Sequence, residues 1–188
     1  TKRKKITSRV TWPQNAQRAG VIVLDTYLTN WKEIVTTAAC EIDSAGTYIE
    51  AENFTGTISQ GTATFIEETS VAGFNGAGYL RSNGGSYNDP PTEEGKQYLV
   101  TFTDPGTYNI WIRGYGLNGT TDSIWVGLND VSTGSLTEAS YNAWEWTNNI
   151  QSGVNTITVP SAGNYYLNIW IRENAHLIDG IYLTTGGE

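Results

Sequence analysis

The chain of 188 residues has little of several things that other protein classes depend on. Its one cysteine, Cys40, allows no disulfide within the chain and fits a small buried thiol. Its one histidine excludes a histidine-rich metal site. Since no apolar run reaches the roughly 18 residues that a membrane-spanning helix needs, we expect no membrane span.

Positive charge is scarce after residue 44. Residues 1–44 carry seven Lys and Arg against four Asp and Glu, whereas residues 45–188 carry four against fifteen, a net charge of −11. An acidic body repels phosphate, so we do not expect nucleic acid as a partner. The acidic body suits a neutral ligand or a bound cation. The first residues lack the apolar stretch of a signal peptide, which fits a mature or excised fragment.

Aromatic and turn-forming residues are plentiful instead. The chain contains seven Trp, eleven Tyr and 21 Gly, a composition typical of an all-β protein with many turns. Short alternating segments separated by turn signals predict a two-sheet β-sandwich of jelly-roll or Greek-key type. We expect its strands at 47–51, 62–67, 79–81, 96–102, 108–114, 123–128, 155–159, 165–172 and 180–184.

The composition and the sign of the charge change near residue 45. We therefore predict an N-terminal extension, or the tail of a neighbouring domain, over residues 1–45, and the β-sandwich over residues 46–188. Within the extension, residues 9–12 and 20–28 are strand candidates. Residues 30–39 fit a short helix or a linker equally well.

The string Ile-Trp-Ile-Arg occurs at 110–113 and again at 169–172. Alternate residues of a strand face opposite sides, so Ile110 and Ile112 share one face while Trp111 and Arg113 share the other. The aliphatic faces of these two strands predict the core between the sheets.

Three carboxylates from opposite ends of the sandwich are candidates for a cation site. Glu50 and Glu52 flank one residue and emerge on the same side, and Asp179 opens the last predicted strand. The first and last strands of a compact domain tend to lie close together, and three facing acids repel one another unless a cation lies among them. Oxygen ligands favour calcium over zinc. Acids at this spacing are also typical of a solvated edge.

Several motifs, in order along residues 47–185, resemble carbohydrate-binding modules of families 6 and 35. Tyr-Ile-Glu-Ala-Glu-Asn-Phe at 48–54 resembles their opening strand, and Gly-Tyr-Leu at 78–80 a later one. The strand at 108–113 resembles their central aromatic strand, and 170–173 with 178–183 resembles their closing pair.

This resemblance implies a galactose-binding-like jelly roll with a structural Ca²⁺ ion held by Glu50, Glu52 and Asp179. It also implies that Tyr79 and Trp144, in loops at one end of the sandwich, clasp a sugar ring. One position departs from the family 6 pattern. Leu177 stands where those modules often have a ligand-binding Asn, which puts the usual ligand geometry in doubt.

Sugar binding needs flat aromatic surfaces with hydrogen-bonding groups beside them. Trp144 and Trp146 are two residues apart, so in an extended segment both face the same side. One of them could then serve as a platform for a sugar ring while the other packs into the core. The remaining candidates lie in polar loops and are Tyr87, Asn83 and His176.

We therefore predict a non-catalytic carbohydrate-binding module, monomeric and secreted or at the cell surface, that holds an attached polysaccharide-degrading enzyme near its polysaccharide or oligosaccharide. A structural or adhesive β-sandwich without a working sugar site is the alternative. A small glycan-cleaving enzyme is a third hypothesis, because Glu138, Glu145 and Glu173 lie in or near candidate loops, but no pair of them shows a distinguishing motif.

Overall fold

The computed structural model describes residues 3–12, 20–29 and 39–186, and they group into two compact units, Thr1–Thr36 and Thr37–Glu188. The first unit contains an antiparallel hairpin of β1 (Arg3–Trp12) and β2 (Gly20–Thr29), in which Val10 pairs with Ile22. The helix-or-linker prediction for residues 30–39 falls, except for Ala39, outside the described residues.

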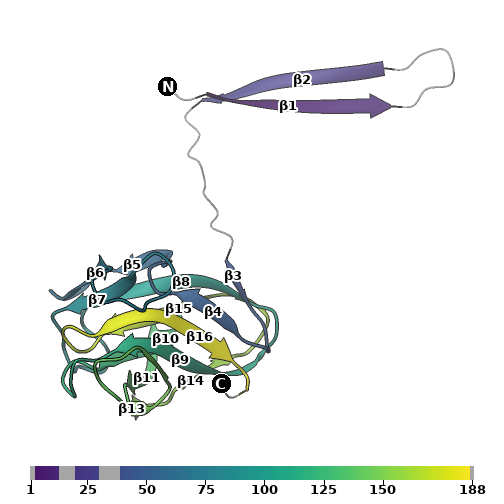
Figure 1. Ribbon diagram of the computed structural model, residues 1–188. Helices are drawn as coiled ribbons and strands as arrows, with labels where there is room; N and C mark the ends of the chain where they lie inside the picture. The colour runs from purple at the N-terminus through teal and green to yellow at the C-terminus, as the bar shows by residue number, and fades with distance from the viewer. Residues whose placement is uncertain (1–2, 13–19, 30–38, 187–188) are drawn as a thin grey trace. The chain divides into compact units, whose positions relative to one another are not determined.

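The second unit is a sandwich of two sheets, which confirms the predicted fold class (Figure 1). The described residues form strands and turns without a helix, so no helix in this part of the chain could cross a membrane.

The first sheet has the order β13-β11-β10-β15-β8-β3, and β5 also pairs with β8. Its strands are β3 (Cys40–Ile42), β5 (Gly56–Ile58), β8 (Gly95–Phe102), β10 (Ser123–Leu128), β11 (Val131–Thr137), β13 (Ile150–Gly153) and β15 (Gly163–Ile171).

The second sheet has the order β12-β9-β16-β7-β6, with β14 also paired to β9 and β4 to β16. Its strands are β4 (Thr47–Glu50), β6 (Thr64–Glu68), β7 (Tyr79–Asn83), β9 (Gly106–Tyr115), β12 (Glu145–Thr147), β14 (Thr156–Val159) and β16 (Leu177–Thr184).

The core lies between the two sheets, as the alternation within the strands predicts. Ile110 and Ile112 of β9 are fully buried, and Leu167 and Ile169 of β15 face them from the other sheet. The outward-facing Trp170 of β15 is nevertheless only 3% exposed. Its indole lies against its register partner Gly95 of β8, where a Cβ would collide with Trp170 Cδ1. Burial on this face of the strand therefore depends on a contact with the neighbouring strand and not on the strand's own pattern.

The sandwich begins before the expected boundary at residue 46. Strand β3 pairs in parallel with β8, with Ile42 opposite Phe102, and Ile42 is fully buried. A strand of three residues is too short to show an alternation, so the change in charge near residue 45 was the stronger signal. That change does not coincide with the edge of the folded unit.

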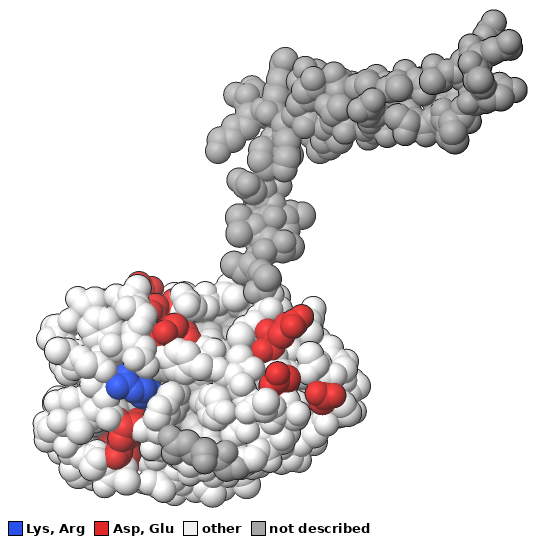
Figure 2. Space-filling view, turned by 45° about the vertical axis from the view of Figure 1, so that its right-hand side comes forward, with Lys and Arg blue, Asp and Glu red and all other residues white. Residues whose placement is uncertain are grey.

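The surface of the sandwich carries its acidic charge in separate groups. On the face shown in Figure 2, Asp and Glu side chains form several patches with little Lys or Arg beside them. This distribution agrees with the net charge of −11 counted over residues 45–188. No single strongly charged surface stands out on that face.

Candidate functional site

The outer face of the second sheet carries a row of aromatic side chains. Strand register places Trp111 of β9 opposite Tyr182 of β16, and Tyr182 opposite Tyr48 of β4. Trp146 of β12 completes the cluster, with its ring centroid 5.8 Å from that of Tyr48 and 6.1 Å from that of Tyr182, both edge to face.

These four side chains and Asn75 line a hollow of about 360 Å³, and we call it the aromatic hollow. The four rings are half-buried and Asn75 is exposed. The indole Nε1 of Trp111 is buried and has no hydrogen-bond partner among the described residues. Apolar ring faces beside an exposed amide match the C–H faces and hydroxyl groups of a sugar ring.

Trp144 lies beside this hollow but packs differently from Trp146. Its ring lies 5.2 Å from that of Tyr79 and 5.5 Å from that of Tyr115, and its Nε1 donates to the Ala72 carbonyl at 3.0 Å. The Arg113 guanidinium lies 5.4 Å from the centre of the indole. Trp144 is therefore half-buried and held from several sides, with part of its ring left for a ligand.

Tyr79 does not present its ring to solvent, which corrects its expected role. It is fully buried beneath Trp144 and Phe74, and its hydroxyl lies 3.0 Å from Ser70 Oγ. Tyr79 supports the Trp144 ring from below.

His176 is also unavailable to a ligand, since it is only 1% exposed. Its Nε2 lies 3.0 Å from Oε1 of Glu138, which is equally buried. A histidine in a short loop reads from sequence as exposed, but here β9 and the segment after β11 cover it.

Tyr87 and Asn83 lie elsewhere on the sandwich. Tyr87 is 61% exposed and stacks on Arg172, whose guanidinium is 4.9 Å from its ring and 5.4 Å from that of Trp125 on β10 of the first sheet. Asn83 is exposed at the end of β7. Of the six predicted sugar-binding residues, the aromatic hollow therefore includes only Trp146, with Trp144 next to it.

Sequence reasoning missed Tyr48, Trp111, Tyr182 and Asn75 as candidates. The alternation of residues within strands could have identified Tyr48, Trp111 and Tyr182. Trp111 lies on the outward face of its strand, and Tyr182 alternates with the core residues Ile181 and Leu183. Nothing in the sequence alone shows that these outward faces adjoin.

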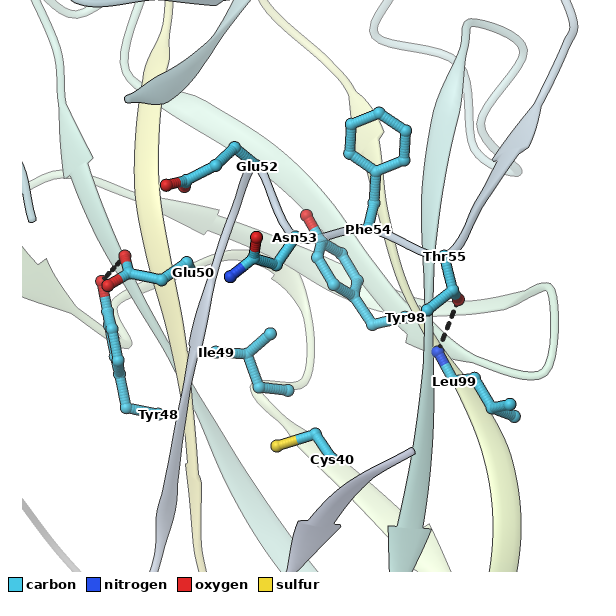
Figure 3. A pocket seen from close by; sticks show the side chains of 10 residues that line it. All are labelled: Cys40, Tyr48, Ile49, Glu50, Glu52, Asn53, Phe54, Thr55, Tyr98 and Leu99. Carbon is cyan, nitrogen blue, oxygen red and sulfur yellow. Dashed lines mark hydrogen bonds between the residues drawn. The ribbon is translucent and has the colours of Figure 1, made fainter. Parts of the chain in front are cut away.

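The three predicted cation ligands lie in one region of the sandwich, around residues 75–77. Asp179 Oδ1 accepts from the amide of Asn75 at 2.9 Å, and Glu52 Oε1 accepts from the amide of Ala77 at 2.9 Å. A Cβ added to Gly76, between them, would lie 2.7 Å from Glu52 Oε1 and 2.9 Å from Glu50 Cδ. Figure 3 shows the carboxylates of Glu50 and Glu52 extending to the same side of the chain.

Burial and repulsion from neighbouring carboxylates raise the pKa values of Glu50 and Asp179. Burial raises the pKa of Glu50, with further increases from Glu52 and Asp179, although the Tyr48 hydroxyl donates a hydrogen bond to Glu50. Burial likewise raises the pKa of Asp179, against the lowering effect of Arg113, which forms an ion pair with it. The single guanidinium leaves the group of three acids with an excess of negative charge.

The residues present fit an oxygen-coordinated cation in kind and charge. Glu52 Oε2 is buried without a hydrogen-bond partner, so it has a free lone pair directed into the protein. In the described residues, however, no three Asp, Glu, His or Cys side chains are arranged as a set of metal ligands, and Arg113 already contacts Asp179. A bound ion would require these carboxylates to turn toward a common centre.

Solved structures share this fold. The C-terminal CBM6 of LamC, a marine laminarinase from Zobellia galactanivorans, matches with a TM-score of 0.53 and 19% identity over 74% of this chain and 99% of its own. CBM35 from Paenibacillus barcinonensis matches with a TM-score of 0.53 and 24% identity over 74% of this chain and 99% of its own.

The GH26-CBM35 β-(1,4)-mannanase of Podospora anserina matches with a TM-score of 0.54 and 17% identity over 77% of this chain, which spans 28% of the mannanase. No family model matches the sequence, and no curated protein matches it. At these identities the likeness shows the fold, and the sandwich has the fold of CBM6 and CBM35 modules.

Proposed function

We propose that the sandwich is a non-catalytic carbohydrate-binding module whose ligand lies against the aromatic hollow. The observation that carries this proposal is the set of four half-buried rings around a space of about 360 Å³, with the exposed Asn75 at its wall. The shared fold with family 6 and family 35 modules supports it.

The hollow suits binding rather than hydrolysis. Glycoside hydrolysis requires two carboxyl groups about 5–10 Å apart on either side of the bond that breaks. No Asp or Glu is among the five described residues that line the hollow. The module would act by raising the local concentration of an attached, secreted polysaccharide-degrading enzyme at its substrate.

We further propose that Ca²⁺ binds among Glu50, Glu52 and Asp179 and stabilises the module. The unused oxygen of Glu52 and the raised pKa values of Glu50 and Asp179 support this proposal. Two residues that line the hollow, Tyr48 and Asn75, would link it to the ion. The Tyr48 hydroxyl donates a hydrogen bond to Glu50, and the backbone amide of Asn75 donates one to Asp179.

Tryptophan fluorescence, titrated against a panel of plant and algal polysaccharides, tests the sugar site. We expect a saturable response that Trp111→Ala and Trp146→Ala each weaken by about tenfold or more, a loss of at least about 1.4 kcal/mol of binding free energy. Tyr87→Ala is the matched control, because Tyr87 lies in a loop against Arg172, which also contacts Trp125 of the first sheet, and does not line the hollow.

Silence across the panel would favour a structural or adhesive sandwich. Release of reducing ends in the same tubes would overturn the non-catalytic assignment.

A further inference from the structure

A buried acid–base pair lies behind the segment that carries Trp144 and Trp146. The side chains of Glu138 and His176 are each 1% exposed, and Glu138 Oε1 lies 3.0 Å from His176 Nε2. Glu138 Oε2 and His176 Nδ1 have no partner among the described residues. The pair does not touch the aromatic hollow, so sugar binding does not account for it.

The backbone of β9 is packed directly onto this pair. Gly114 pairs with Glu145 on one side and with Ile178 on the other. A Cβ at Gly114 would collide with Glu138 Oε1 and would lie 2.8 Å from His176 Nε2. Only glycine leaves room there, so the pair lies directly against the face of β9 at Gly114.

The segment that carries Trp144 and Trp146 begins at Glu138 and is held by further hydrogen bonds. The Glu145 carboxylate accepts from the amide of Ser140 at 2.7 Å and from the amide of Ala139, which closes residues 138–145 into a loop. One end of that loop is held by the Glu138 amide, which donates to the Asp122 carbonyl at 2.9 Å. Glu145 stands between Trp144 and Trp146, so any shift of the loop moves both indoles.

His176 is fixed from its own side. Its amide donates to Ser82 Oγ at 3.0 Å, and the amide of Ser82 donates to the His176 carbonyl at 3.0 Å. The backbone of His176 is thus anchored to β7, and Glu138, which contacts the imidazole, joins the loop to that anchor.

We propose that Glu138 and His176 are positioning residues that share one proton and thereby hold the Trp144–Trp146 segment in place. This inference rests on the proposed function for its biological consequence, a sugar affinity that depends on pH. With one proton the buried pair is neutral overall. Without it an ionised carboxylate would face a neutral imidazole in a space that excludes water, which is costly.

The direction of the pH effect follows from the groups around the pair. Burial raises the pKa of Glu138, His176 opposes this, and the nearby Glu145 raises it further. Because the pKa of Glu138 is higher in the folded loop than in an unfolded chain, protonation of Glu138 stabilises the folded loop. This stabilisation is complete at a pH below the ordinary pKa of a carboxyl group, and it is lost as the pH rises through the raised pKa. We therefore expect the segment to be held at acidic pH and loosened as the pH increases.

Other ionisable groups on adjoining elements have effects of their own. Burial would raise the pKa of Glu145, but hydrogen bonds from Ser140 and Ala139 outweigh it and lower that pKa. Burial and then Glu173 raise the pKa of Asp122.

Burial and Asp122 also raise the pKa of Tyr141, and Arg172 forms an ion pair with Glu173. The pKa of Asp122 is raised like that of Glu138, so both groups would make the loop respond to pH in the same direction. The experiment must therefore distinguish the two.

The test follows the indole N–H signals of ¹⁵N-tryptophan-labelled protein by NMR without sugar, from about pH 5 to about pH 9. Trp144→Phe identifies the Trp144 signal, whose N–H donates to Ala72. We expect that signal to titrate in the wild type and to stay flat in Glu138→Gln, since the amide can donate to His176 but cannot ionise. Asp122→Asn is the control and should titrate like the wild type.

A flat wild-type profile, an unchanged titration in Glu138→Gln, or its abolition by Asp122→Asn would overturn the inference. Polysaccharide binding over the same pH range is measured in parallel. We expect wild-type affinity to fall with rising pH, by about tenfold for each unit of pKa shift coupled to the loop. If no sugar binds at any pH while the Trp144 signal titrates as expected, the proposed function fails and the positioning role stands.

Discussion

For a single aromatic residue, the contacts of its ring determine whether it can bind a ligand or serves to pack the fold. Tyr79 and Trp146 are both sugar-binding candidates in the sequence, Tyr79 from the resemblance and Trp146 because it lies two residues from Trp144. Tyr79 is fully buried, with Phe74 and Trp144 against its ring and Ser70 at its hydroxyl. Trp146 instead lies edge-on between two half-buried tyrosines and keeps part of its surface free.

One buried hydrogen bond tests how much a single polar contact contributes to stability. Tyr98 is 2% exposed, and its hydroxyl donates to the Ala51 carbonyl at 2.7 Å. Tyr98→Phe leaves that carbonyl without this donor, so we expect the free energy of unfolding to fall by about 1–2 kcal/mol. Thermal denaturation should show a drop of about 2–4 °C for each kcal/mol.

The matched control is Tyr165→Phe. The Tyr165 hydroxyl donates to the Ser161 carbonyl at 2.9 Å, but this contact is exposed to water. We expect a change below about 0.5 kcal/mol there. Equal effects of the two substitutions would contradict the explanation by burial.

Among the strands, the shortest ones show how pairing overrides local pattern. Strand β3 has three residues and no readable alternation, yet it adds a parallel neighbour to β8 and buries Ile42. Strand β12 is equally short, and it places Trp146 beside Arg113 on the outer face of β9. Neither strand would be stable alone, and both exist because a longer strand offers free backbone groups beside them.

Truncation tests where the folded unit begins. Deleting residues 1–38 should leave the melting temperature of the sandwich nearly unchanged, because β3 remains. Deleting residues 1–45 removes Ile42 and exposes the edge of β8, so we expect a loss of about 2–4 kcal/mol. Thermal melts of the two truncated proteins make the comparison, and equal melting temperatures would show that β3 contributes nothing.

For the sandwich as a whole, the proposed ion would join the two ends of the module. Glu50 and Glu52 come from its beginning and Asp179 from its last strand, and β4 pairs with β16 beside them. We expect a chelator to lower the melting temperature of protein prepared with Ca²⁺, since a ligand at 100 times its dissociation constant adds about 2.7 kcal/mol to stability.

Glu52→Gln should remove most of this calcium effect, whereas the exposed Glu67→Gln should retain it. Thermal melts with and without the chelator, and elemental analysis of the purified protein, provide the measurements. A melting temperature that does not respond to the chelator, in protein that contains no metal, would rule out the calcium proposal.

Much of the architecture was predictable because strand geometry is local. Alternation alone placed Ile110 and Ile112 in the core and sent Trp111 to the outer face, and the pairing of strands bears this out. That Glu50 and Glu52 lie in the same region as Asp179 was also expected, because the first and last strands of a compact domain tend to lie close together.

The amino-acid sequence thus determined the fold class, the inner faces of the strands and the acidic character of the body, since each depends on composition or on neighbours two residues apart. Only the tertiary structure decided which aromatic rings stay accessible, why His176 is buried against Glu138, and that Tyr48, Trp111, Trp146 and Tyr182 border one hollow. The physical reason is that accessibility depends on contacts between segments far apart in the chain.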